Sequence, residues 1–439
     1  MWRKLIMIIG IDIRVLAKGT RTGIEEYVLN LLPRLLLLDL PTGEAGLPTG
    51  EAGKKIKYKL FYNAFKKIKL DYSWLKFGNV ELKEFRIPNR PLDFFSQTFK
   101  RPTVDKFLGK IDIFFSPHFL PISLPKKCKR VITFHDLSFE HHPQFFSSSR
   151  KLWHFLTFPK EQAKKAKKII TDSQSTKEDL IKIYKISPDK IKVIYLGIDK
   201  NFKPIKKDNP RFKRIIEKYG LPALPAGRPA LPAGRPKNFI LYFGTIEPRK
   251  NLILIIKAFE FLKEKFSKSS LEANWKGFEG FVVGRKKNNI FNDLKLVIAG
   301  SRGWLYKDIF KAVENSKYKK DIIFTGIIDD KDKPYLYNLA NVFVYPSFFE
   351  GFGFPPLEAM ACGVPTIVSN TSSLPEVVGD GAIMIDPYNI DELAFAIRKV
   401  LEDRDLRGDL IKKGLKQAKK FDWDKTAQQV LEIFREIKK

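Results

Sequence analysis

The stretch at residues 345–365 combines paired glycines and paired prolines in an order that suits the binding of an anion. Gly351 and Gly353 carry no side chain, so the backbone around them can approach a ligand closely. Pro355 and Pro356 suit the first turn of a helix, because the N–H groups that they lack would have no partner there. A helix beginning at this point offers N–H groups and the positive end of its dipole. The stretch therefore predicts a diphosphate site where a strand ends and a helix begins.

Two glutamates lie on either side of this predicted turn. Glu350 is expected in the loop and Glu358 one turn inside the helix. A carboxylate at each place can accept hydrogen bonds from hydroxyl groups, one set on a sugar and one on a ribose. Two glutamates at this spacing are common and usually solvated or capping residues, so the glycines, the prolines and the helix signals decide in favour of binding.

A second candidate element, Phe243–Asn251, places two adjacent cations between an apolar strand and a helix. Arg249 can hold a phosphate by two parallel hydrogen bonds, and Lys250 can act as a point charge. The pair favours the neutralisation of a diphosphate. The competing interpretation is an ordinary ion pair with Glu247 on a helix surface.

The first half of the chain offers fewer signals. His135 ends the apolar run at residues 131–134, and His118 follows another predicted strand. A single histidine at such a place is more often structural than catalytic. Composition and spacing alone therefore give neither histidine a role.

In their order and flanking structure, these elements resemble those of retaining glycosyltransferases of family 4, whose E-x7-E element matches Glu350 and Glu358. The resemblance is close to mannosyltransferase-like members and extends over nearly the whole chain. It implies the α/β fold called GT-B, in which two Rossmann-like domains face each other across a cleft.

The resemblance also implies roles for individual residues. Glu350 and His135 are expected to be catalytic, with Glu350 either a nucleophile or a group that positions the donor, and His118 to lie on the acceptor side. The other contacts implied are to the donor: its diphosphate by Arg249, Lys250, Gly23, Phe352 and Gly353, and its ribose and base by Glu358, Gly326 and Ile327. Thr245 stands where many members have arginine, so the phosphate contacts are expected to depart from the family pattern.

Apolar strand-like runs alternate with helical patterns along the chain, which is typical of parallel β/α domains. Strands are predicted at 5–16, 56–62, 111–115, 131–134, 239–243, 294–299, 321–325, 342–345 and 366–369. Helices are predicted at 24–38, 150–167, 176–185, 250–266, 305–315, 332–339, 354–362 and 390–402. The expected domains are an N-terminal acceptor-side domain at 1–197, a linker at 198–237, a nucleotide-sugar-binding domain at 238–420, and a terminal helix at 421–439 that packs back on the first domain.

Two perfect short duplications interrupt this pattern, at residues 40–53 and 223–236. Both are rich in proline or glycine and poor in apolar side chains that could enter a core. We interpret them as flexible surface insertions.

Composition limits the class of protein and its partners. The chain has 439 residues, 44% of them hydrophobic, which is enough for two cores. Its formal net charge of +31 favours polyanionic partners such as nucleic acid, anionic lipid or a phosphorylated substrate. Two cysteines are too few for a disulfide framework or a zinc site, which favours a reducing, cytoplasmic location. No apolar run approaches the roughly 20 residues that a membrane span needs, so membrane contact would be peripheral.

Taken together, the sequence predicts a hexosyltransferase that uses a nucleoside diphosphate sugar, with GDP-mannose favoured, and a saccharide or lipid-linked acceptor in cell-surface glycan synthesis. No Asp-x-Asp pair needs to hold a metal in the expected site, because Arg249 and Lys250 would supply the positive charge, so neither a metal nor another cofactor is expected. Two alternatives stay open: a basic nucleic-acid-binding protein, and a GT-B enzyme that epimerises or phosphorolyses sugars. No nucleic acid is expected as partner under the favoured interpretation.

Overall fold

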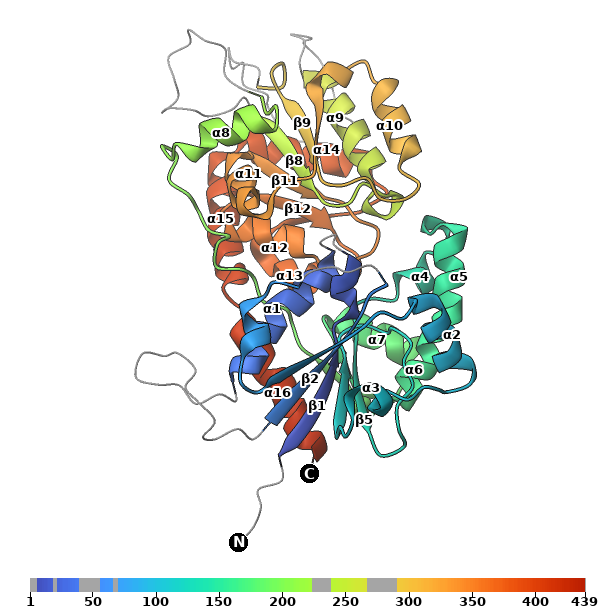
Figure 1. Cartoon of the computed structure of the whole chain (residues 1–439). Helices are drawn as coiled ribbons and strands as arrows, with labels where there is room; N and C mark the ends of the chain where they lie inside the picture. The colour runs from blue at the N-terminus through green and yellow to red at the C-terminus, as the bar shows by residue number, and fades with distance from the viewer. Residues whose placement is uncertain are drawn as a thin grey trace, which may run out of the picture. The chain divides into compact units, whose positions relative to one another are not determined.

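The computed structural model describes residues 6–18, 22–38, 56–65, 70–222, 238–266 and 290–438. The chain divides into two compact units (Figure 1). The first comprises residues 1–143, 148–197 and 421–439, and the second comprises residues 144–147 and 198–420. Both predicted insertions lie outside the described residues.

The first unit is built on a seven-stranded parallel sheet in the order β3-β2-β1-β4-β5-β6-β7. Its strands are β1 (Met7–Asp12), β2 (Ile56–Asn63), β3 (Val80–Phe85), β4 (Ile113–Ser116), β5 (Lys129–Phe134), β6 (Lys168–Thr171) and β7 (Ile191–Val193). Its α-helices are α1 (Gly23–Leu37), α2 (Asn89–Thr98), α3 (Asp105–Leu108), α4 (Ser138–His141), α5 (Ser148–Thr157), α6 (Pro159–Lys165), α7 (Gln174–Lys182) and α16 (Trp423–Lys438).

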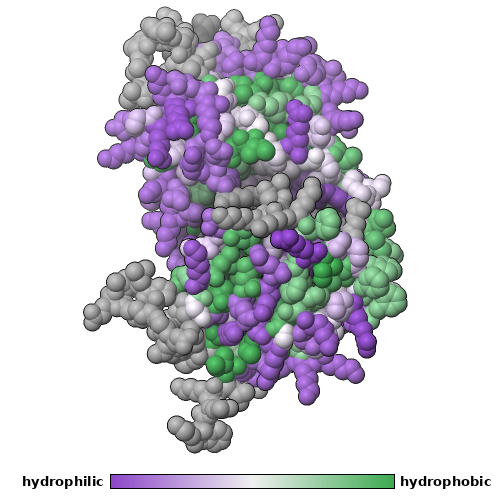
Figure 2. Space-filling view, in the orientation of Figure 1, coloured by the Kyte–Doolittle hydropathy of each residue, from purple (hydrophilic) through white to green (hydrophobic). Residues whose placement is uncertain are grey.

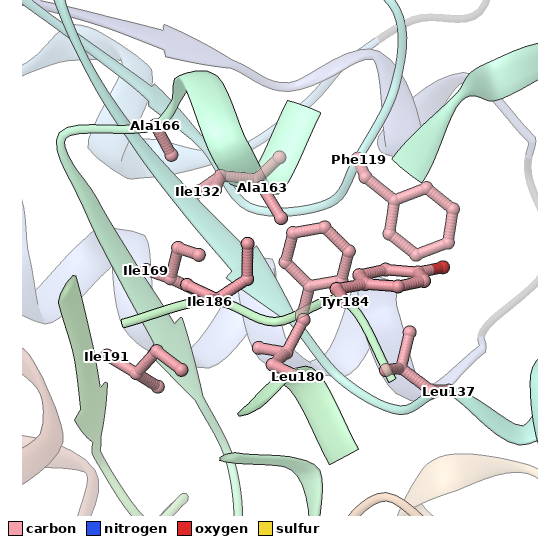
Figure 3. Close-up of a cluster of buried hydrophobic side chains, with 11 residues drawn as sticks. Phe119, Ile132, Leu137, Ala163, Ala166, Ile169, Leu180, Tyr184, Ile186 and Ile191 are labelled. Atoms are coloured by element: carbon pink, nitrogen blue, oxygen red, sulfur yellow. The ribbon is translucent and has the colours of Figure 1, made fainter. Parts of the chain in front are cut away.

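Helices cover both faces of this sheet (Figure 1), which explains why its strands are continuous apolar runs. On one face, side chains of β5 and β6 pack with α6 and α7 in a fully buried cluster (Figure 3). The cluster consists of Phe119, Ile132, Phe134, Leu137, Ala163, Ala166, Ile169, Leu180, Tyr184, Ile186 and Ile191. This core fixes the ends of β5 and β6, where candidate polar residues lie.

The terminal helix α16 belongs to the first unit, where it packs against α1. Its apolar stripe at Ala427, Val430, Leu431 and Phe434 is buried, as the helical spacing requires. Lys129 on β5 donates a hydrogen bond to the carbonyl of Ile437 at 2.6 Å. The last helix of the chain therefore completes the core of the unit that the chain begins.

The second unit has a six-stranded parallel sheet in the order β10-β9-β8-β11-β12-β13. Its strands are β8 (Phe239–Phe243), β9 (Lys295–Ala299), β10 (Ile322–Gly326), β11 (Val342–Tyr345), β12 (Thr366–Ser369) and β13 (Ile383–Ile385). Its α-helices are α8 (Arg211–Lys218), α9 (Leu252–Phe266), α10 (Lys307–Glu314), α11 (Lys333–Leu339), α12 (Phe354–Ala361), α13 (Leu374–Val378), α14 (Ile390–Glu402) and α15 (Arg404–Ala418).

Three expectations about local structure need correction. The helix expected at 150–167 is two helices, because Phe158 has a left-handed backbone (φ 46°) and Pro159 starts α6 without an N–H group. The strand expected at 5–16 ends at Asp12, where the backbone N–H of Arg14 turns back to the Asp12 carboxylate. The segment expected as a linker is partly folded: α8 packs against α11 in the second unit.

Among the described residues, no helix is long and apolar enough to cross a bilayer.

Candidate functional site

The two predicted donor-binding elements meet at one edge of the second sheet. The connection from β8 leads to β9 on one side, whereas β11 lies on the other side of β8. In such a sheet the loops after these two strands leave in opposite directions and open a crevice beyond the strand ends. Phe343 pairs with Leu241, so β8 and β11 end at the same level. The topology thus brings residues 244–251 beside residues 346–353.

The loop after β8 forms a 3-10 turn, Pro248–Lys250, before α9 begins. The helix expected from residue 250 therefore starts two residues later, because Asn251 adopts a left-handed backbone (φ 57°). The amide of Asn251 donates to the carbonyl of Pro346 at 3.2 Å, and Phe348 N–H donates to the carbonyl of Arg249 at 2.9 Å. These bonds tie the two loops together and fix the position of Lys250.

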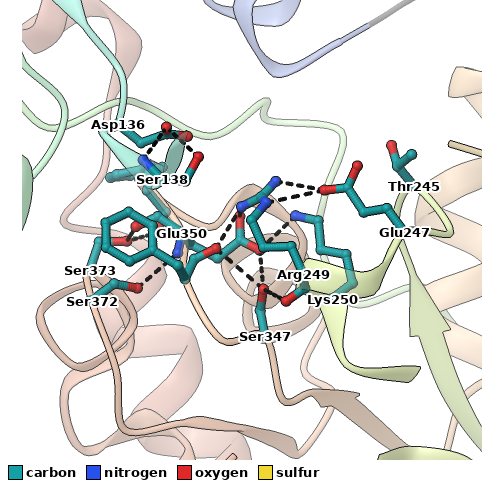
Figure 4. Close-up of polar contacts among 12 residues, drawn as sticks. Asp136, Ser138, Thr245, Glu247, Arg249, Lys250, Ser347, Glu350, Ser372 and Ser373 are labelled. Carbon is teal, nitrogen blue, oxygen red and sulfur yellow. Dashed lines mark hydrogen bonds and ion pairs between the residues drawn. The ribbon is translucent and has the colours of Figure 1, made fainter. Parts of the chain in front are cut away.

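The carboxylate of Glu350 is the centre of a buried charged cluster (Figure 4). Lys250 Nζ lies 2.6 Å from Glu350 Oε1, and a guanidinium nitrogen of Arg249 lies 3.2 Å from Oε2. Ser347 also donates to Oε1, and Lys250 donates to the Tyr345 hydroxyl at 2.7 Å. Both carboxylate oxygens of Glu350 thus already have cationic partners.

Arg249 bridges two carboxylates within this cluster. Its Nε and a terminal nitrogen bond Glu247 Oε1 at 3.1 and 2.9 Å. The ion pair with Glu247, the competing interpretation of this segment, therefore exists, but Glu247 is buried and does not lie on a helix surface. Glu247, Arg249, Lys250 and Glu350 carry two charges of each sign, so these four side chains are neutral as a group.

The electrostatics keep Glu350 ionised. Burial raises the pKa of a carboxyl group, but the charges of Arg249 and Lys250 and the bonds from Lys250 and Ser347 outweigh burial and lower the pKa of Glu350 to about 2. For Lys250, burial and the neighbouring Arg249 charge lower the pKa of the ammonium, and Glu350 opposes both effects. At neutral pH, Glu350 can accept hydrogen bonds but cannot donate a proton.

The turn between Glu350 and α12 has the geometry that its sequence predicts. Gly353 has φ 101°, and a Cβ there would come within 2.7 Å of Leu374. Ser373 Oγ lies 3.0 Å from the carbonyl oxygens of both Glu350 and Phe352. Pro355 and Pro356 have no N–H, so the donors available at the start of α12 are confined to the residues before them.

Glu350 is also held by a strained neighbour. Ser372 has φ 52°, unusual for a residue with a side chain, and its Oγ accepts the N–H of Glu350 at 2.8 Å. Ser347, Ser372 and Ser373 were not predicted as site residues. Their only sequence signal is a small hydroxyl side chain directly after a strand or before a short helix.

The remaining predicted donor residues lie further from this cluster. Glu358 is half-buried in α12 and accepts a hydrogen bond from Tyr337 of α11 at 2.7 Å. Gly326 ends the edge strand β10 with φ 72°, and Ile327 after it is 74% exposed. Gly326 and Ile327 lie at the same edge of the sheet as the Glu350 cluster but apart from it, because β9 and β8 lie between β10 and β11.

In the first unit, His135 at the end of β5 contacts Asp172 at the end of β6. Nδ1 lies 2.5 Å from Asp172 Oδ2, and Nε2 lies 2.8 Å from the carbonyl oxygen of Pro117. Burial lowers the pKa of His135, but the Asp172 charge and both hydrogen bonds outweigh it, and the pKa is raised. Two acceptors on two ring nitrogens are satisfied together by the imidazolium form. Asp172, which was not predicted as a site residue, is thus the charged partner of His135.

The other two candidates of the first unit border the same group. The rings of His118 and His135 lie 6.0 Å apart, and Tyr27 of α1 contacts His135 edge-on at 5.0 Å. Gly23 is the exposed first residue of α1, with open space where a Cβ would lie. His118, His135 and Gly23 thus lie at the edge of their sheet at which its strands end.

Comparison with known proteins identifies the family. Residues 227–417 match Glycosyl transferases group 1, and residues 71–202 match Glycosyltransferase Family 4. O-antigen chain mannosyltransferase B of Escherichia coli is 31% identical over 74% of this chain and 74% of that protein. This chain belongs to glycosyltransferase family 4. Its predicted enzyme class, a glycosyltransferase, is confirmed.

Solved structures support the fold assignment of this family 4 glycosyltransferase. Sucrose-phosphate synthase from Thermosynechococcus elongatus superposes with a TM-score of 0.68 over 98% of this chain and 99% of that chain, at 19% identity. WaaG, a glycosyltransferase involved in lipopolysaccharide biosynthesis, gives 0.64 over 97% and 99%, at 14% identity. Together with the two parallel sheets, these similarities confirm the GT-B fold.

Proposed function

We propose that this glycosyltransferase transfers mannose from GDP-mannose to a saccharide or lipid-linked acceptor in cell-surface glycan synthesis, with retention of anomeric configuration. The similarity to O-antigen chain mannosyltransferase B supports mannose as the sugar. Serotype-specific mannosyltransferase WbdA of Escherichia coli, 32% identical over 62% of this chain and 29% of that protein, supports the same choice. A nucleotide-sugar donor is supported by the structural similarity to HepE of Anabaena, solved with UDP and glucose.

The observation that carries the proposal is the buried Lys250–Glu350–Arg249 cluster at the switch point of the second sheet. Lys250 is buried and Arg249 is partly buried, so their attraction for a diphosphate is screened less by solvent than on a surface, although Glu247 and Glu350 balance their charges. The start of α12 lies in the same loop and adds backbone N–H donors. In this arrangement the positive groups stabilise the charge that grows on the leaving diphosphate.

Glu350 serves in this proposal as a positioning carboxylate and not as a nucleophile. Its Oε1 already accepts from Lys250 and Ser347, and its Oε2 faces Arg249. A carboxylate with both oxygens paired attacks poorly but can accept a hydroxyl of the donor sugar. Its negative charge also stabilises the positive charge that develops on the sugar ring.

The transfer step then uses the donor's own phosphate as base. The bond between the anomeric carbon and the phosphate oxygen breaks, and the acceptor oxygen attacks the same face of the sugar. The acceptor proton passes to the phosphate oxygen that leaves, so GDP and the mannoside are the products. Attack on the face that the phosphate leaves retains the anomeric configuration.

The site requires no metal in this proposal, because Arg249 and Lys250 supply the positive charge. The enzyme acts in the cytoplasm, at the inner face of a membrane when its acceptor is lipid-linked. Glycosyl transfer in the presence of excess EDTA tests the first statement. A fall to background that added Mg²⁺ or Mn²⁺ restores would overturn it.

A thermal-shift series tests the donor. GDP-mannose and GDP are expected to raise the melting temperature, because a ligand that binds only the folded state stabilises it by mass action. UDP-glucose and ADP-glucose at the same concentration are expected to give smaller shifts. A larger shift with UDP-glucose would replace GDP-mannose as the donor.

Product analysis separates transfer from the other GT-B reactions. Incubation with GDP-mannose and a mannoside acceptor is expected to give an α-linked product only when the acceptor is present, since GDP-mannose is an α-linked donor. Mannose 1-phosphate formed from GDP-mannose and inorganic phosphate, or an epimerised sugar nucleotide, would contradict the proposed reaction. A β-linked product would contradict retention.

A further inference from the structure

Two helices of the first unit expose large apolar side chains to solvent. On and directly after α2, three phenylalanines are each at least 50% exposed: Phe94, Phe95 and Phe99. On and after α5, four side chains are 48–70% exposed: Leu152, Phe155, Leu156 and Phe158. Exposed apolar residues scattered singly are ordinary, but contiguous groups mark interaction surfaces. These seven side chains define what we call the aromatic face.

Within each of the two groups, the aromatic rings of this face lie close to one another. The rings of Phe95 and Phe99 lie 5.5 Å apart, and Phe94 lies 5.8 Å from Phe95. Phe155 and Phe158 lie 6.1 Å apart. These helices also bury another face: Leu92 and Ser96 of α2, and Thr157 of α5, are buried in the unit. Each helix is thus apolar on the side that the fold does not use.

Both helices flank one loop, residues 117–124, which follows β4. Ser123 Oγ donates to the carbonyl of Ser96 on α2 at 2.7 Å, and Trp153 of α5 packs on Phe119 at 5.9 Å. Figure 2 shows hydrophobic side chains along the edge of the first unit where Figure 1 places α5 and α2. The same loop carries His118, whose ring stacks on Trp153 at 6.1 Å. The aromatic face therefore borders the candidate acceptor side.

The two segments that carry the aromatic face are rich in basic residues. Residues 148–167 contain one acidic side chain, Glu161, and six basic ones: Arg150, Lys151, Lys160, Lys164, Lys165 and Lys167. Residues 86–101 contain one acidic side chain, Asp93, which pairs with Arg14, and four basic ones: Arg86, Arg90, Lys100 and Arg101. A second copy of this chain would bring the same charges together and repel. An anionic lipid surface attracts the lysines and accepts the rings at once.

We infer that α2 and α5 dock this enzyme on an anionic membrane, with the aromatic face inserted among the lipid headgroups and the loop at 117–124 held at the surface. The inference that the acceptor is lipid-linked follows from this placement and rests on the proposed function, because His118 would then lie where a membrane presents its headgroups. Docking itself requires neither donor nor acceptor.

Co-sedimentation of the full-length protein with vesicles tests the inference. Phosphatidylcholine vesicles that contain about 30% phosphatidylglycerol are expected to bind the protein at least tenfold more tightly than vesicles of phosphatidylcholine alone. Salt is expected to weaken this binding. The double variants Phe95→Ser/Phe99→Ser and Phe155→Ser/Leu156→Ser are each expected to lose tenfold or more of the affinity for the anionic vesicles. These side chains are exposed, so the variants are expected to fold.

Tyr388→Ser is the matched control, since Tyr388 is a 72% exposed ring in the second unit, and its affinity for vesicles is expected to stay unchanged. Thermal shifts with GDP-mannose are expected to be equal in all variants, so a failed donor assay and a failed docking assay are told apart. Wild-type binding that both double variants retain would overturn the inference. So would equal binding to neutral vesicles, or a wild-type dimer in solution that Phe155→Ser/Leu156→Ser converts to monomer.

Discussion

The two units present polar groups at the ends of similar parallel sheets, but they hold their charges differently. In the second unit, Glu350 lies between Lys250 and Arg249 in a network of balanced charge. In the first, His135 lies between one carboxylate and one carbonyl, with a single charge pair. The same sheet edge thus supplies a rigid multivalent cluster in one unit and a two-residue ion pair in the other.

The difference indicates that the charges of the second unit are fixed in place, whereas the charge pair of the first unit can be lost with a change of pH. A network of four charges, three of them buried and that of Arg249 partly buried, is costly to rearrange, because removing one member leaves another uncompensated. A histidine pair can be released by loss of one proton. Low pH protonates carboxylates and is therefore expected to weaken the Glu350 cluster of the second unit. High pH deprotonates the imidazolium and is expected to weaken the His135 pair of the first unit.

The substitution expected to have the largest effect is Lys250→Met. It removes a cation from the proposed diphosphate site and leaves Arg249 as the cationic partner of Glu350, so kcat/KM for GDP-mannose is expected to fall about 1,000-fold. Lost stability is expected too, about 3–5 kcal/mol for a broken buried pair. Steady-state kinetics and denaturant unfolding measure both.

Lys263→Met is the matched control for this variant. Lys263 is a buried lysine in the same unit and pairs with Asp321 at 2.8 Å, outside the candidate site. The Lys263→Met variant is expected to lose comparable stability. Because Lys263 lies outside the candidate site, kcat/KM is expected to change less than about threefold. Equal kinetic losses in the two variants would mean that Lys250 acts through folding alone.

Glu350→Gln is expected to have the next largest effect. The amide keeps the shape but not the charge, so kcat is expected to fall about 100-fold with less change in KM. The pH dependence follows from the pKa of about 2 in the folded state, below the ordinary 4.5. The stability that ionised Glu350 contributes is fully present above pH 4.5 and is lost as the pH falls towards 2, in total about 3 kcal/mol.

Urea unfolding of the second unit from about pH 5 to about pH 2 measures that contribution. Wild type is expected to lose stability more steeply than Glu350→Gln. Asp321→Asn serves as comparison, since Asp321 also holds two lysines, Lys263 and Lys295, but lies outside the site. It is expected to keep kcat. Identical acid profiles of wild type and Glu350→Gln would show that the cluster does not hold Glu350 ionised.

The first unit is expected to respond in the opposite pH direction and more weakly. The pKa of His135 is raised above its ordinary 6.5, so the stability from its charge is complete below 6.5 and is lost as the pH rises through the folded pKa. Asp172→Asn is expected to lower that pKa. Ring-nitrogen NMR titration measures the change, with His154 as internal reference, since burial lowers the pKa of His154 to about 4. A titration of His135 that Asp172→Asn leaves in place would contradict the pair.

Much of the charged cluster in the second unit could be predicted from sequence, because local chemistry specifies the elements that carry it. The prolines and Gly353 determine the start of α12, and the apolar runs of β8 and β11 determine where Lys250 and Glu350 follow. The pairing of the cations with Glu350 could not be predicted. It depends on the loops after two strands lying side by side, which is a property of strand order.

Contacts from distant segments escaped prediction for the same reason. Ser372 reaches Glu350 from the loop after β12, and its left-handed backbone is not signalled by a serine. Asp172 meets His135 only because β5 and β6 are neighbours. The break of the helix at Phe158 was signalled by Pro159, but the helical pattern on both sides outweighed it in the sequence. Periodicity predicts elements, whereas side-chain partners follow from their assembly.

Glu358→Gln is expected to have the smallest effect. It tests whether the donor contacts extend from the Lys250–Glu350–Arg249 cluster into α12. Glu358 belongs to the same helix as the turn at Gly353 but pairs with Tyr337, a neutral partner. If Glu358 accepts hydroxyls of the donor ribose, the amide loses one charged hydrogen bond, and KM for GDP-mannose is expected to rise about tenfold while kcat stays within twofold. Tyr337→Phe removes this hydrogen-bond donor but keeps the carboxylate, so it is expected to lower the melting temperature and leave KM unchanged. Equal KM changes in the two variants would place Glu358 with the packing of α11 on α12 and confine the donor contacts to the Lys250–Glu350–Arg249 cluster.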